Sequence, residues 1–523
     1  MATCSPFLCA PAARPPPDAV DTPISTVTAP QTLRSLAELP GPRGIPLLGN
    51  LLQIETPRMH QQLEAWCAEF GPFYKLKLGS RPILVVGDHA ATAAALRDRP
   101  DGFRRTARME EIGSEMGLLP GVFGVNGEAW KRQRRMVMAG FDPTHVRRYH
   151  PALVKVSQRL TARWRRAARQ GAAIDLQADL MRYTVDAIAG LAFGAEVTTL
   201  DSDGDIIQQH LDKIFPALFN RMMSPLPTWR WVRTPAVRQL EASMRAVNTA
   251  VQGFIAAARL RLQADPALRT EPRNLLEAML VAADEAGSGI DDAQVASNVL
   301  TMLLAGEDTT ANTLAWMIDL LWRHSASLAR AADEVRRLVA DPADPTLDEL
   351  AELDFVEACA HETMRLKPVA PVIGLQALRD TVVGNVRLPA GGVIINVMRR
   401  DSVSDQHLPR AAAFEPERWL ADGTPGAVAH AASAAKRVSM PFGAGPRICR
   451  CESEGQRKPV RLRLGNQFVG CAAEDEQTDY WRMTDCFHQR ALDASARSHA
   501  ISVVDLQGNR LSRQFEGLAQ ERR

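Results

Sequence analysis

The stretch that decides the fold is Phe442-Gly443-Ala444-Gly445-Pro446-Arg447-Ile448-Cys449, near the carboxyl end of the chain. Glycines at two of its positions let the backbone pass close to another group and adopt conformations that are closed to other residues. Immediately after Cys449 the character of the sequence changes abruptly. We therefore expect a tight loop that ends at Cys449, and the segments before it must show what this loop holds.

The spacing of Phe442, Gly443, Gly445, Arg447 and Cys449 resembles the haem-binding loop of the cytochrome P450 family. The resemblance implies that the cofactor is haem b and that the Cys449 thiolate is the metal ligand of its iron. A thiolate ligand pushes electron density onto the iron and favours cleavage of the O–O bond. By the same resemblance Phe442 and Gly443 belong to the cofactor-binding loop, and Arg447 is a candidate partner of a haem propionate.

Length and composition set the broad class. At 523 residues the chain exceeds the roughly 250–300 residues of a usual single core, so we expect either two domains or one unusually large catalytic domain. The formal net charge of +2 gives no electrostatic reason to expect a nucleic-acid partner. The eight cysteines show no repeated framework spacing, which favours a reducing compartment.

The amino-terminal segment differs from the rest of the chain. Residues 1–38 are rich in Pro, Ala and Thr, and we interpret them as a disordered leader. They contain no apolar run near the roughly 20 residues that span a bilayer, and no secretory signal pattern. We therefore expect no membrane anchor, a cytoplasmic protein, and a catalytic domain over residues 39–449.

Hydrophobic periodicity predicts a mainly α fold with small β-sheets. Residues 73–78 alternate and residues 82–86 are apolar and β-branched, which predicts a hairpin. Helical periodicity dominates from about residue 88 to 370, and its longest stretch runs from an N-cap at Asp291 to about Arg323. At 1.5 Å per residue that helix would extend roughly 50 Å. Beyond Pro368 the pattern changes to short strands and turns.

The middle of that long helix carries Ala305-Gly306-Glu307-Asp308-Thr309-Thr310. A mid-helix Gly costs about 1 kcal/mol relative to Ala, and a buried Asp-Thr pair adds a desolvation cost, so the segment departs from what a structural helix favours. It resembles the family's oxygen-binding groove, where Ala305 and Gly306 leave room above the haem. The resemblance implies that Thr309 hydrogen-bonds the bound oxygen and that Asp308 relays protons. The alternative is a kinked helix whose Thr bonds to the preceding turn.

Trp130-Lys131-Arg132-Gln133-Arg134 resembles the family's Trp-x-x-x-Arg helix. The resemblance implies that Trp130 and Arg134 reach a haem propionate, for which the planar fork of guanidinium is suited. Its position about 175 residues before the oxygen-binding segment matches the family order. Taken alone, this basic run would be interpreted as a solvated helix face.

Glu362 and Arg365 lie three residues apart on a predicted helix, and Arg418 follows about fifty residues later in Phe414-Glu415-Pro416-Glu417-Arg418-Trp419. An isolated pair of this kind is usually a solvated ion pair worth a few tenths of a kcal/mol. Together the two segments resemble the family's Glu-x-x-Arg helix and the loop whose Arg completes a network. The resemblance implies that the three side chains form a buried structural lock that serves folding and cofactor retention.

The residues after Cys449 depart from the family pattern. The family has a Gly two residues after the cysteine, where an apolar-faced helix begins, but this chain has Cys451 there. Residues 460–464 alternate with a period of two, which does not suit a helix. We interpret residues 450–523 as a poorly ordered, non-family tail that follows a frame change and leaves the fold incomplete. A natural divergent C-terminus is the alternative.

The resemblance spans residues 39–449 and implies a haem-thiolate monooxygenase that inserts one atom of O₂ into a hydrophobic small-molecule substrate. Electrons would come from a separate ferredoxin, flavodoxin or reductase, because no Gly-rich dinucleotide fingerprint follows a predicted strand. A peroxide-using family member is one alternative, and the presence of Asp308 and Thr309 argues against it. The other alternative is a non-catalytic protein that binds haem poorly, for which the tail is the evidence.

Overall fold

The computed structural model describes residues 32–449 except 80, 119, 142, 203–206, 212, 225 and 421–433, and it describes residues 143–146 by their backbone alone. Most of the leader and the whole tail predicted from the sequence lie outside the described residues. Within them helices predominate and the strands form two small sheets, which confirms the predicted fold class.

The helices and strands lie in an order that runs from a strand-rich amino-terminal part to a long helical part and back to strands. The α-helices are α1 (Met59–Phe70), α2 (His89–Arg97), α3 (Ala107–Glu115), α4 (Gly127–Gly140), α5 (Pro143–Arg169), α6 (Leu176–Phe193), α7 (Ile207–Leu211), α8 (Ile214–Met223), α9 (Pro235–Ala264), α10 (Leu275–Asp284), α11 (Asp292–Arg323), α12 (Ser325–Leu338), α13 (Leu347–Ala351) and α14 (Asp354–Leu366). The strands are β1 (Arg34–Ser35), β2 (Phe73–Leu78), β3 (Arg81–Val86), β4 (Phe103–Arg104), β5 (Val372–Ala377), β6 (Thr381–Val383), β7 (Val386–Leu388) and β8 (Val393–Val397).

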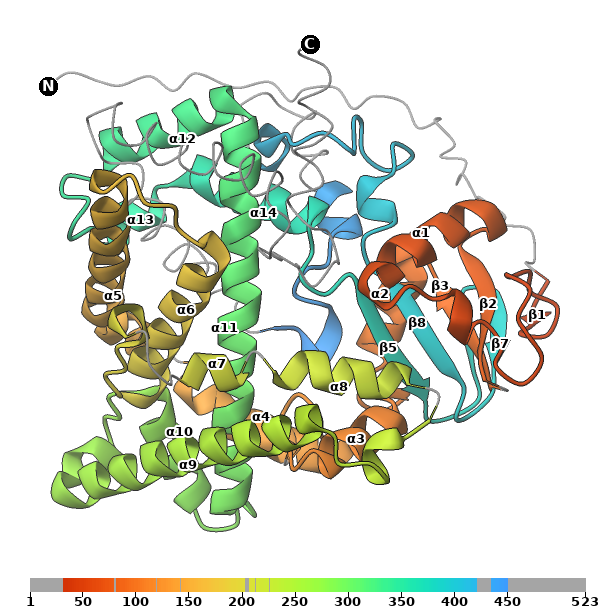
Figure 1. The fold of residues 1–523 in the computed structure, drawn as a ribbon, viewed down its shortest axis with the longest axis horizontal. Coiled ribbons are helices and arrows are strands. Elements are labelled where there is room, and N and C mark those ends of the chain that lie inside the picture. The colour runs from red at the N-terminus through yellow and green to blue at the C-terminus, as the bar shows by residue number, and fades with distance from the viewer. Residues whose placement is uncertain are drawn as a thin grey trace, which may run out of the picture.

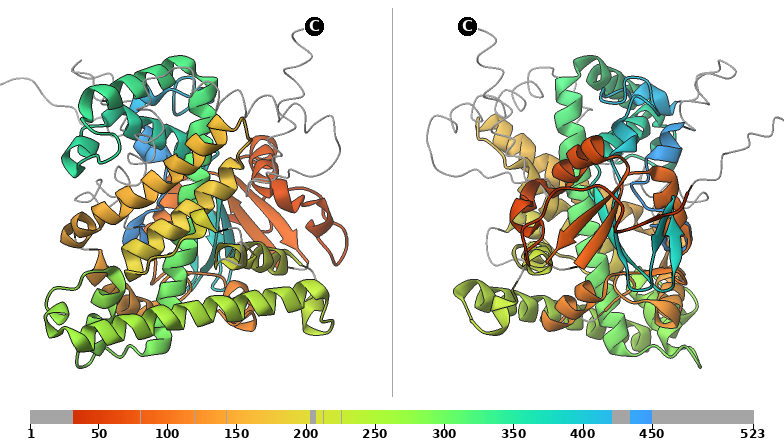
Figure 2. Two further views of the ribbon diagram at one scale, coloured as in Figure 1. Left: turned by 60° about the vertical axis from the view of Figure 1, so that its left-hand side comes forward. Right: turned by 90° about the vertical axis from the view of Figure 1, so that its right-hand side faces the viewer.

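The long helix α11 passes through the middle of the molecule, with the larger sheet on one side and α5 and α6 on the other (Figure 1 and Figure 2). Its start is fixed by a reciprocal cap: the Asp291 carboxylate accepts from the N–H of Gln294, and the Gln294 side chain accepts from the N–H of Asp291. It has 32 residues, so it extends about 48 Å. The predicted N-cap and end of this helix are confirmed.

The larger sheet has the strand order β2-β3-β8-β5-β4. The predicted hairpin is confirmed, because β2 and β3 pair antiparallel from Phe73 opposite Val86 to Leu78 opposite Arg81. β3 then pairs parallel with β8, so the amino-terminal hairpin joins strands formed some 300 residues later. A second sheet has the order β1-β7-β6, and its strand β1 lies within the last residues of the predicted leader.

Two apolar clusters hold the helices around α11. One contains buried side chains of α6, α9, α10 and α11, and the other joins α5, α6, α11, α12 and α14. At roughly 20–33 cal/mol per Å² of apolar surface buried, such clusters provide the main stabilisation of a helical fold. They fix α11 in the middle of the molecule, so any group that projects from its centre has a defined position.

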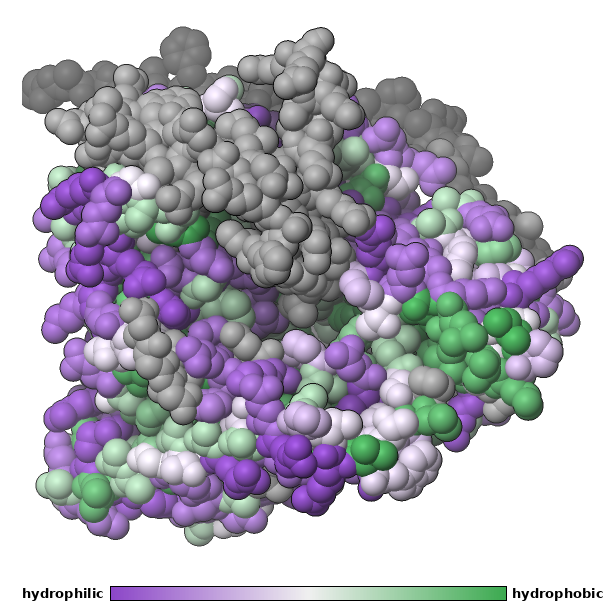
Figure 3. All heavy atoms as spheres, in the orientation of Figure 1, coloured by the Kyte–Doolittle hydropathy of each residue, from purple (hydrophilic) through white to green (hydrophobic). Residues whose placement is uncertain are grey.

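One apolar area lies on the surface instead of in the core. The space-filling view shows apolar side chains gathered over the segment between β1 and β2 (Figure 3), where Ile45, Leu47, Leu48 and Leu52 are exposed. Contiguous exposed apolar surface of this kind marks places that meet apolar partners or ligands. None of the helices in the described part of the chain has the length and apolar character needed to cross a bilayer.

Candidate functional site

The loop that ends at Cys449 is tightly constrained. Gly443 and Gly445 have φ values of 79° and 71°, in the left-handed region that favours glycine. A Cβ on Gly445 would lie 2.6 Å from the Cα of Arg97, at the end of α2, so no other residue fits there. The N–H of Cys449 donates to the carbonyl of Phe442, 2.9 Å away, which closes the loop. The loop thereby presents Cys449 as an exposed residue.

Arg447, two residues before the cysteine, is held against α4. Its guanidinium lies 4.8 Å from the ring centre of Trp130, which is buried, and donates to the carbonyl of Val125. Arg134, one turn along α4, donates to the carbonyl of Ile448 at 2.8 Å. The structure therefore brings together Trp130, Arg134 and Arg447, although more than 300 residues separate α4 from the loop.

Two further arginines, Arg99 and Arg105, join this cluster and were not found from the sequence. Burial, together with the charges of Arg105 and Arg447, lowers the pKa of Arg99 to about 8. Burial and the charges of Arg105 and Arg134 lower the pKa of Arg447 to about 10. Because guanidinium remains protonated in proteins, the lowered pKa values reflect the cost of burying these cations and of placing them near one another.

Three of these arginines have buried donor atoms that remain unpaired within the described part of the chain. The Nε atoms of Arg99, Arg105 and Arg447, and Nη2 of Arg99, are buried without a hydrogen-bond partner among the described residues. The negative charge of Glu110 opposes the lowering of the Arg447 pKa. However, the Glu110 carboxylate also pairs with Arg104 and accepts a hydrogen bond from Asn126. Unsatisfied buried donors are costly, so the residues present fit an anionic ligand, and carboxylate groups match the guanidinium fork.

The middle of α11 has an open face. Ala305 and Thr309, one turn apart, are exposed although most residues of this helix are buried. Thr309 is therefore not part of a buried pair, which corrects the expectation from the sequence. Its hydroxyl donates to the carbonyl of Ala305 at 2.6 Å, the bond to the preceding turn that was the structural alternative.

Gly306 and Asp308 lie on other faces of the same helix. Gly306 is buried, and a Cβ there would come within 3.0 Å of Ile188, so this glycine lets α6 approach α11 closely. It does not share the open face with Ala305, contrary to expectation. Burial raises the pKa of Asp308 to about 6, against the hydrogen bond from Asn312 Nδ2 to its Oδ1 at 2.7 Å. Gln177 in turn donates to Asn312 Oδ1 at 3.0 Å.

Glu362, Arg365 and Arg418 meet in the interior. Arg365 donates to both carboxylate oxygens of Glu362 at 2.7 Å, and Arg418 Nε donates to Oε1 at 2.9 Å. The side chains of Glu362 and Arg365 have no exposed area. Burial opposes ionisation of Glu362, but the hydrogen bond and charges of the two arginines outweigh it and hold the pKa of this carboxyl below its usual range.

This triad ties together several loops. Arg365 also donates to the carbonyls of Ser402, Ala411 and Ala413 at 2.5, 2.6 and 3.0 Å. The carboxylate of Glu362 further accepts from the N–H of Glu415 and from the indole of Trp419, both at 2.9 Å. The segment that leads to the cysteine loop is therefore anchored to α14 by a network in which every charge has several partners.

Comparison with known proteins identifies the family. The Cytochrome P450 family model matches residues 39–450. The chain is 30% identical over 323 residues to pentalenene oxygenase of Streptomyces avermitilis, a match that covers 61% of this chain and 66% of that one. It is 25% identical over 391 residues to the protein LUTEIN DEFICIENT 5, chloroplastic, of Arabidopsis thaliana, which covers 73% and 64%.

A third relative is named as self-sufficient. The chain is 26% identical over 404 residues to a self-sufficient cytochrome P450 monooxygenase of Aspergillus niger, covering 75% of this chain and 37% of that protein. The matches thus span between 37% and 66% of the length of these three relatives. Cytochromes P450 are monooxygenases that bind haem iron through a cysteine thiolate. The chain belongs to the cytochrome P450 family.

Proposed function

We propose that this chain oxidises a hydrophobic small molecule as a haem-thiolate monooxygenase supplied with electrons by a separate protein. The observation that carries the proposal is the set of unpartnered buried N–H groups of Arg99, Arg105 and Arg447 beside the Cys449 loop, because they call for an anionic ligand at that place. The test is the carbon monoxide difference spectrum of the reduced, purified protein. A strongly red-shifted Soret band requires both haem and a cysteine thiolate.

Each group has a defined role in holding the cofactor. Cys449 would supply the thiolate, and the guanidiniums with Trp130 would bind the haem carboxylates, whose charge would offset the cost of the clustered cations. When bound, haem supplies the chemistry of O₂ activation. The glycines of the loop and the exposed Ala305 carry little or no side chain, so each would let the cofactor come close to the backbone.

Asp308 and Thr309 would manage protons. With a pKa of about 6, Asp308 exchanges a proton near neutral pH, and Asn312 occupies its Oδ1 so that Oδ2 carries that proton. The Thr309 hydroxyl is exposed on the neighbouring position and can leave its bond to Ala305 to donate into the site. A mechanism that uses O₂ and electrons needs protons to be delivered to the site, whereas peroxide arrives already protonated. The presence of these two groups therefore favours O₂ over peroxide as the oxidant.

Thr309→Ala is expected to uncouple electron use from product formation. Without the hydroxyl, protons reach the reacting oxygen in the wrong order and reduced oxygen escapes as peroxide. Product formed per electron should fall by on the order of tenfold or more, while haem content is unchanged. The measurement is peroxide and product per electron consumed.

Thr313→Ala is the matched control for this change. Thr313 makes the same type of bond, to the carbonyl of Thr309 at 2.8 Å, but it is buried one turn further along α11. Its replacement should leave the coupling unaltered. If Thr309→Ala and the unaltered protein form the same amount of product per electron, the Thr309 hydroxyl has no part in proton delivery.

The electron donor and the substrate complete the proposed reaction. We assign electron supply to a separate protein, whereas the relative in Aspergillus niger is named as self-sufficient. A hydrophobic substrate is supported by the apolar residues that end the segment from 104 to 125 and fill the segment from 369 to 374. Turnover with reduced nicotinamide alone, without any added donor protein, would exclude the separate donor.

A second candidate function is a non-catalytic relative that retains haem weakly. The observation that favours it is that the family match ends at residue 450, with Cys451 where the family has Gly. We propose that residues 39–449 are the catalytic domain and that residues 450–523 are a non-family tail. A haem thiolate needs backbone N–H donors and a packed helix on its proximal side, because these contacts set the iron potential.

Replacement of residues 450–523 by a family-like segment is expected to strengthen haem retention. The new segment would begin with Gly two residues after Cys449 and continue as an apolar-faced helix. We expect the unaltered chain to retain substoichiometric haem and the replaced chain to approach one haem per chain, with the red-shifted carbon monoxide band. If the unaltered chain already purifies with one haem and a stable thiolate signature, the frame-change interpretation is wrong.

A further inference from the structure

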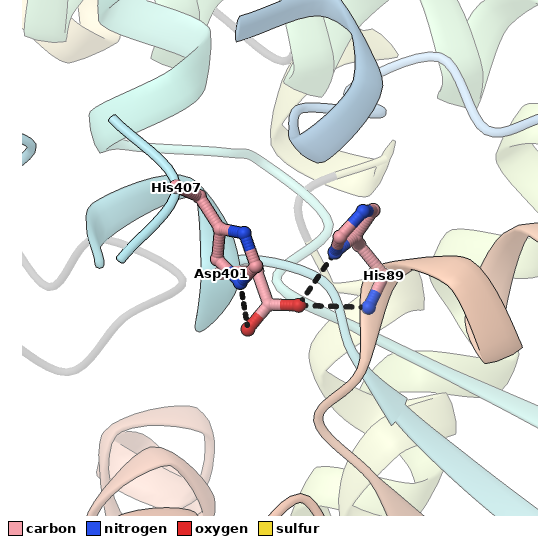
Figure 4. Close-up of side chains that lie close together, drawn as sticks. All are labelled: His89, Asp401 and His407. Atoms are coloured by element: carbon pink, nitrogen blue, oxygen red, sulfur yellow. Dashed lines mark hydrogen bonds and ion pairs between the residues drawn. The ribbon is translucent and has the colours of Figure 1, made fainter. Parts of the chain in front are cut away.

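Three potential metal ligands meet away from the cysteine site. They are His89, the first residue of α2, Asp401 in the 3-10 turn Asp401–Val403, and His407 shortly after that turn (Figure 4). The distance from His89 Nδ1 to Asp401 Oδ2 is 2.8 Å, and that from His407 Nε2 to Asp401 Oδ1 is 3.6 Å. All three ligand atoms lie within 4.8 Å of one another.

We propose that His89, Asp401 and His407 form a binding site for a divalent transition metal of the zinc type. Two imidazoles and one carboxylate are ligands that Zn²⁺ prefers. With metal–ligand bonds of about 2.0–2.2 Å, ligand atoms in a tetrahedral site lie roughly 3.3 Å apart. The observed distances of 2.8 and 3.6 Å, which join the imidazoles to Oδ2 and Oδ1 of Asp401, lie on either side of this value, and all three ligand atoms lie within 4.8 Å of one another. Side-chain rotation would bring them to metal-binding separations.

The surroundings of the three side chains suit such a site. The Asp401 side chain is 3% exposed, whereas those of His89 and His407 are 24% and 29% exposed, which leaves an approach from solvent. The two imidazole rings stand edge to face with centres 4.9 Å apart, so neither ring blocks the other. An ordinary surface ion pair joins one cation to one exposed carboxylate, whereas here two accessible imidazoles flank one buried carboxylate.

Besides the imidazole of His89, two groups already donate to Asp401. Arg400 Nη1 donates to Oδ1 at 2.6 Å, and the N–H of His89 donates to Oδ2 at 2.8 Å. Each carboxylate oxygen has a second lone pair, and ligating carboxylates usually accept such outer hydrogen bonds. The positive charge of Arg400 lowers the affinity for a cation, so we expect weaker binding than at an all-cysteine site.

Metal binding has a defined proton balance. In the metal-free state the carboxylate accepts from His89, so Nδ1 carries the imidazole proton. When the metal bonds to Nδ1, that proton moves to Nε2, and the imidazole remains neutral. His407 binds through Nε2 and keeps its proton on Nδ1. No change of oxidation state is involved.

The site would fix the helix that supports the cysteine loop. α2 begins at His89 and ends at Arg97, where Gly445 packs against its last turn. A metal bridge from His89 to the segment of Asp401 and His407 would tie the start of α2 to residues next to Ser402, whose carbonyl Arg365 holds. We therefore expect bound zinc to raise the melting temperature, whether or not haem is present.

The test is a zinc titration of the full chain after treatment with a chelator, in competition with a chromophoric indicator. Other cysteines and histidines of the chain also bind zinc, so the decisive quantity is the difference between variants. His407→Gln should lose one equivalent of zinc, or bind it at least about tenfold more weakly. The rise of the melting temperature with zinc should disappear in the same variant.

His89→Gln is the second variant, because it keeps the N–H that donates to Asp401 while removing the other imidazole ligand. His210→Gln is the control: His210 is also half-buried, but it contacts Ser243 Oγ and lies outside the cluster. It should keep the zinc stoichiometry of the unaltered chain. Unchanged zinc affinity and stoichiometry in both His407→Gln and His89→Gln would overturn the proposal.

Discussion

Cys449→Ser is expected to abolish the red-shifted carbon monoxide band of the reduced protein entirely. A serine hydroxyl does not ionise near neutral pH and cannot replace the thiolate that gives this band. The loop geometry should survive the change, because the bond from the N–H of residue 449 to the carbonyl of Phe442 involves only the backbone. The measurement is the difference spectrum, normalised to the amount of folded protein.

Cys451→Ser is the matched control, since it makes the same chemical change two residues later. Cys451 lacks the spacing from Gly443, Gly445 and Arg447 that places Cys449 at the end of the loop. Its replacement should leave the band unaltered. Loss of the band in Cys451→Ser, together with its persistence in Cys449→Ser, would transfer the ligand assignment to the other cysteine.

Features with a local signature could be predicted from the sequence. The alternation of residues 73–78 specified the hairpin, because a period of two separates the two faces of a strand. The cap at Asp291 and the apolar steps after it specified α11 to within one residue. The cysteine loop was recognisable for a similar reason, since its glycines at positive φ are local requirements of the backbone.

Contacts between distant segments could not be predicted in the same way. Arg99 and Arg105 join the guanidinium cluster from the segment around β4, and no periodicity or motif in that segment distinguishes them from solvated arginines. His89 and Asp401 are 312 residues apart, and their meeting depends on how α2 packs. Such contacts are set by tertiary packing, which a pattern within one segment does not encode.

The middle of α11 shows how a motif can identify a site and still misplace its residues. The motif assigned Gly306 to the open groove, but helical geometry turns it by about 100° from Ala305, toward Ile188 of α6. The same rotation returns Thr309 to the face of Ala305, one turn later, and both are exposed. The motif therefore located the segment of α11 that has an open face, whereas the surroundings of each side chain depended on the neighbouring helices.

Glu362→Ala is expected to destabilise the protein by about 3–5 kcal/mol, because it leaves two buried guanidiniums without their shared carboxylate. Arg418 would keep its ion pair with Glu415, but Arg365 would keep only carbonyl partners, whose dipoles do not neutralise its charge. The loss is a large share of the roughly 5–15 kcal/mol that stabilises a typical domain. The measurement is urea unfolding near neutral pH, with haem content determined in parallel.

Asp333→Ala provides the contrast, because Asp333 and Arg336 form an ion pair with the same spacing of three residues on exposed helix surface. Its loss should cost less than about 1 kcal/mol. The two effects should also differ with pH. Folding lowers the pKa of Glu362, so its contribution is fully present above the unfolded carboxyl pKa of about 4.3 and is lost as pH falls through the folded value.

Equal unfolding free energies for Glu362→Ala and Asp333→Ala would show that the buried triad adds no more than a surface pair. A large difference with haem content unchanged would limit the triad to folding. Only a joint loss of stability and haem content supports both roles, since Arg365 and Arg418 hold the carbonyls of the segment between Ser402 and Ala413 that leads to the cysteine loop. Release of that segment would free the loop from its anchor on α14, and with it the position of Cys449.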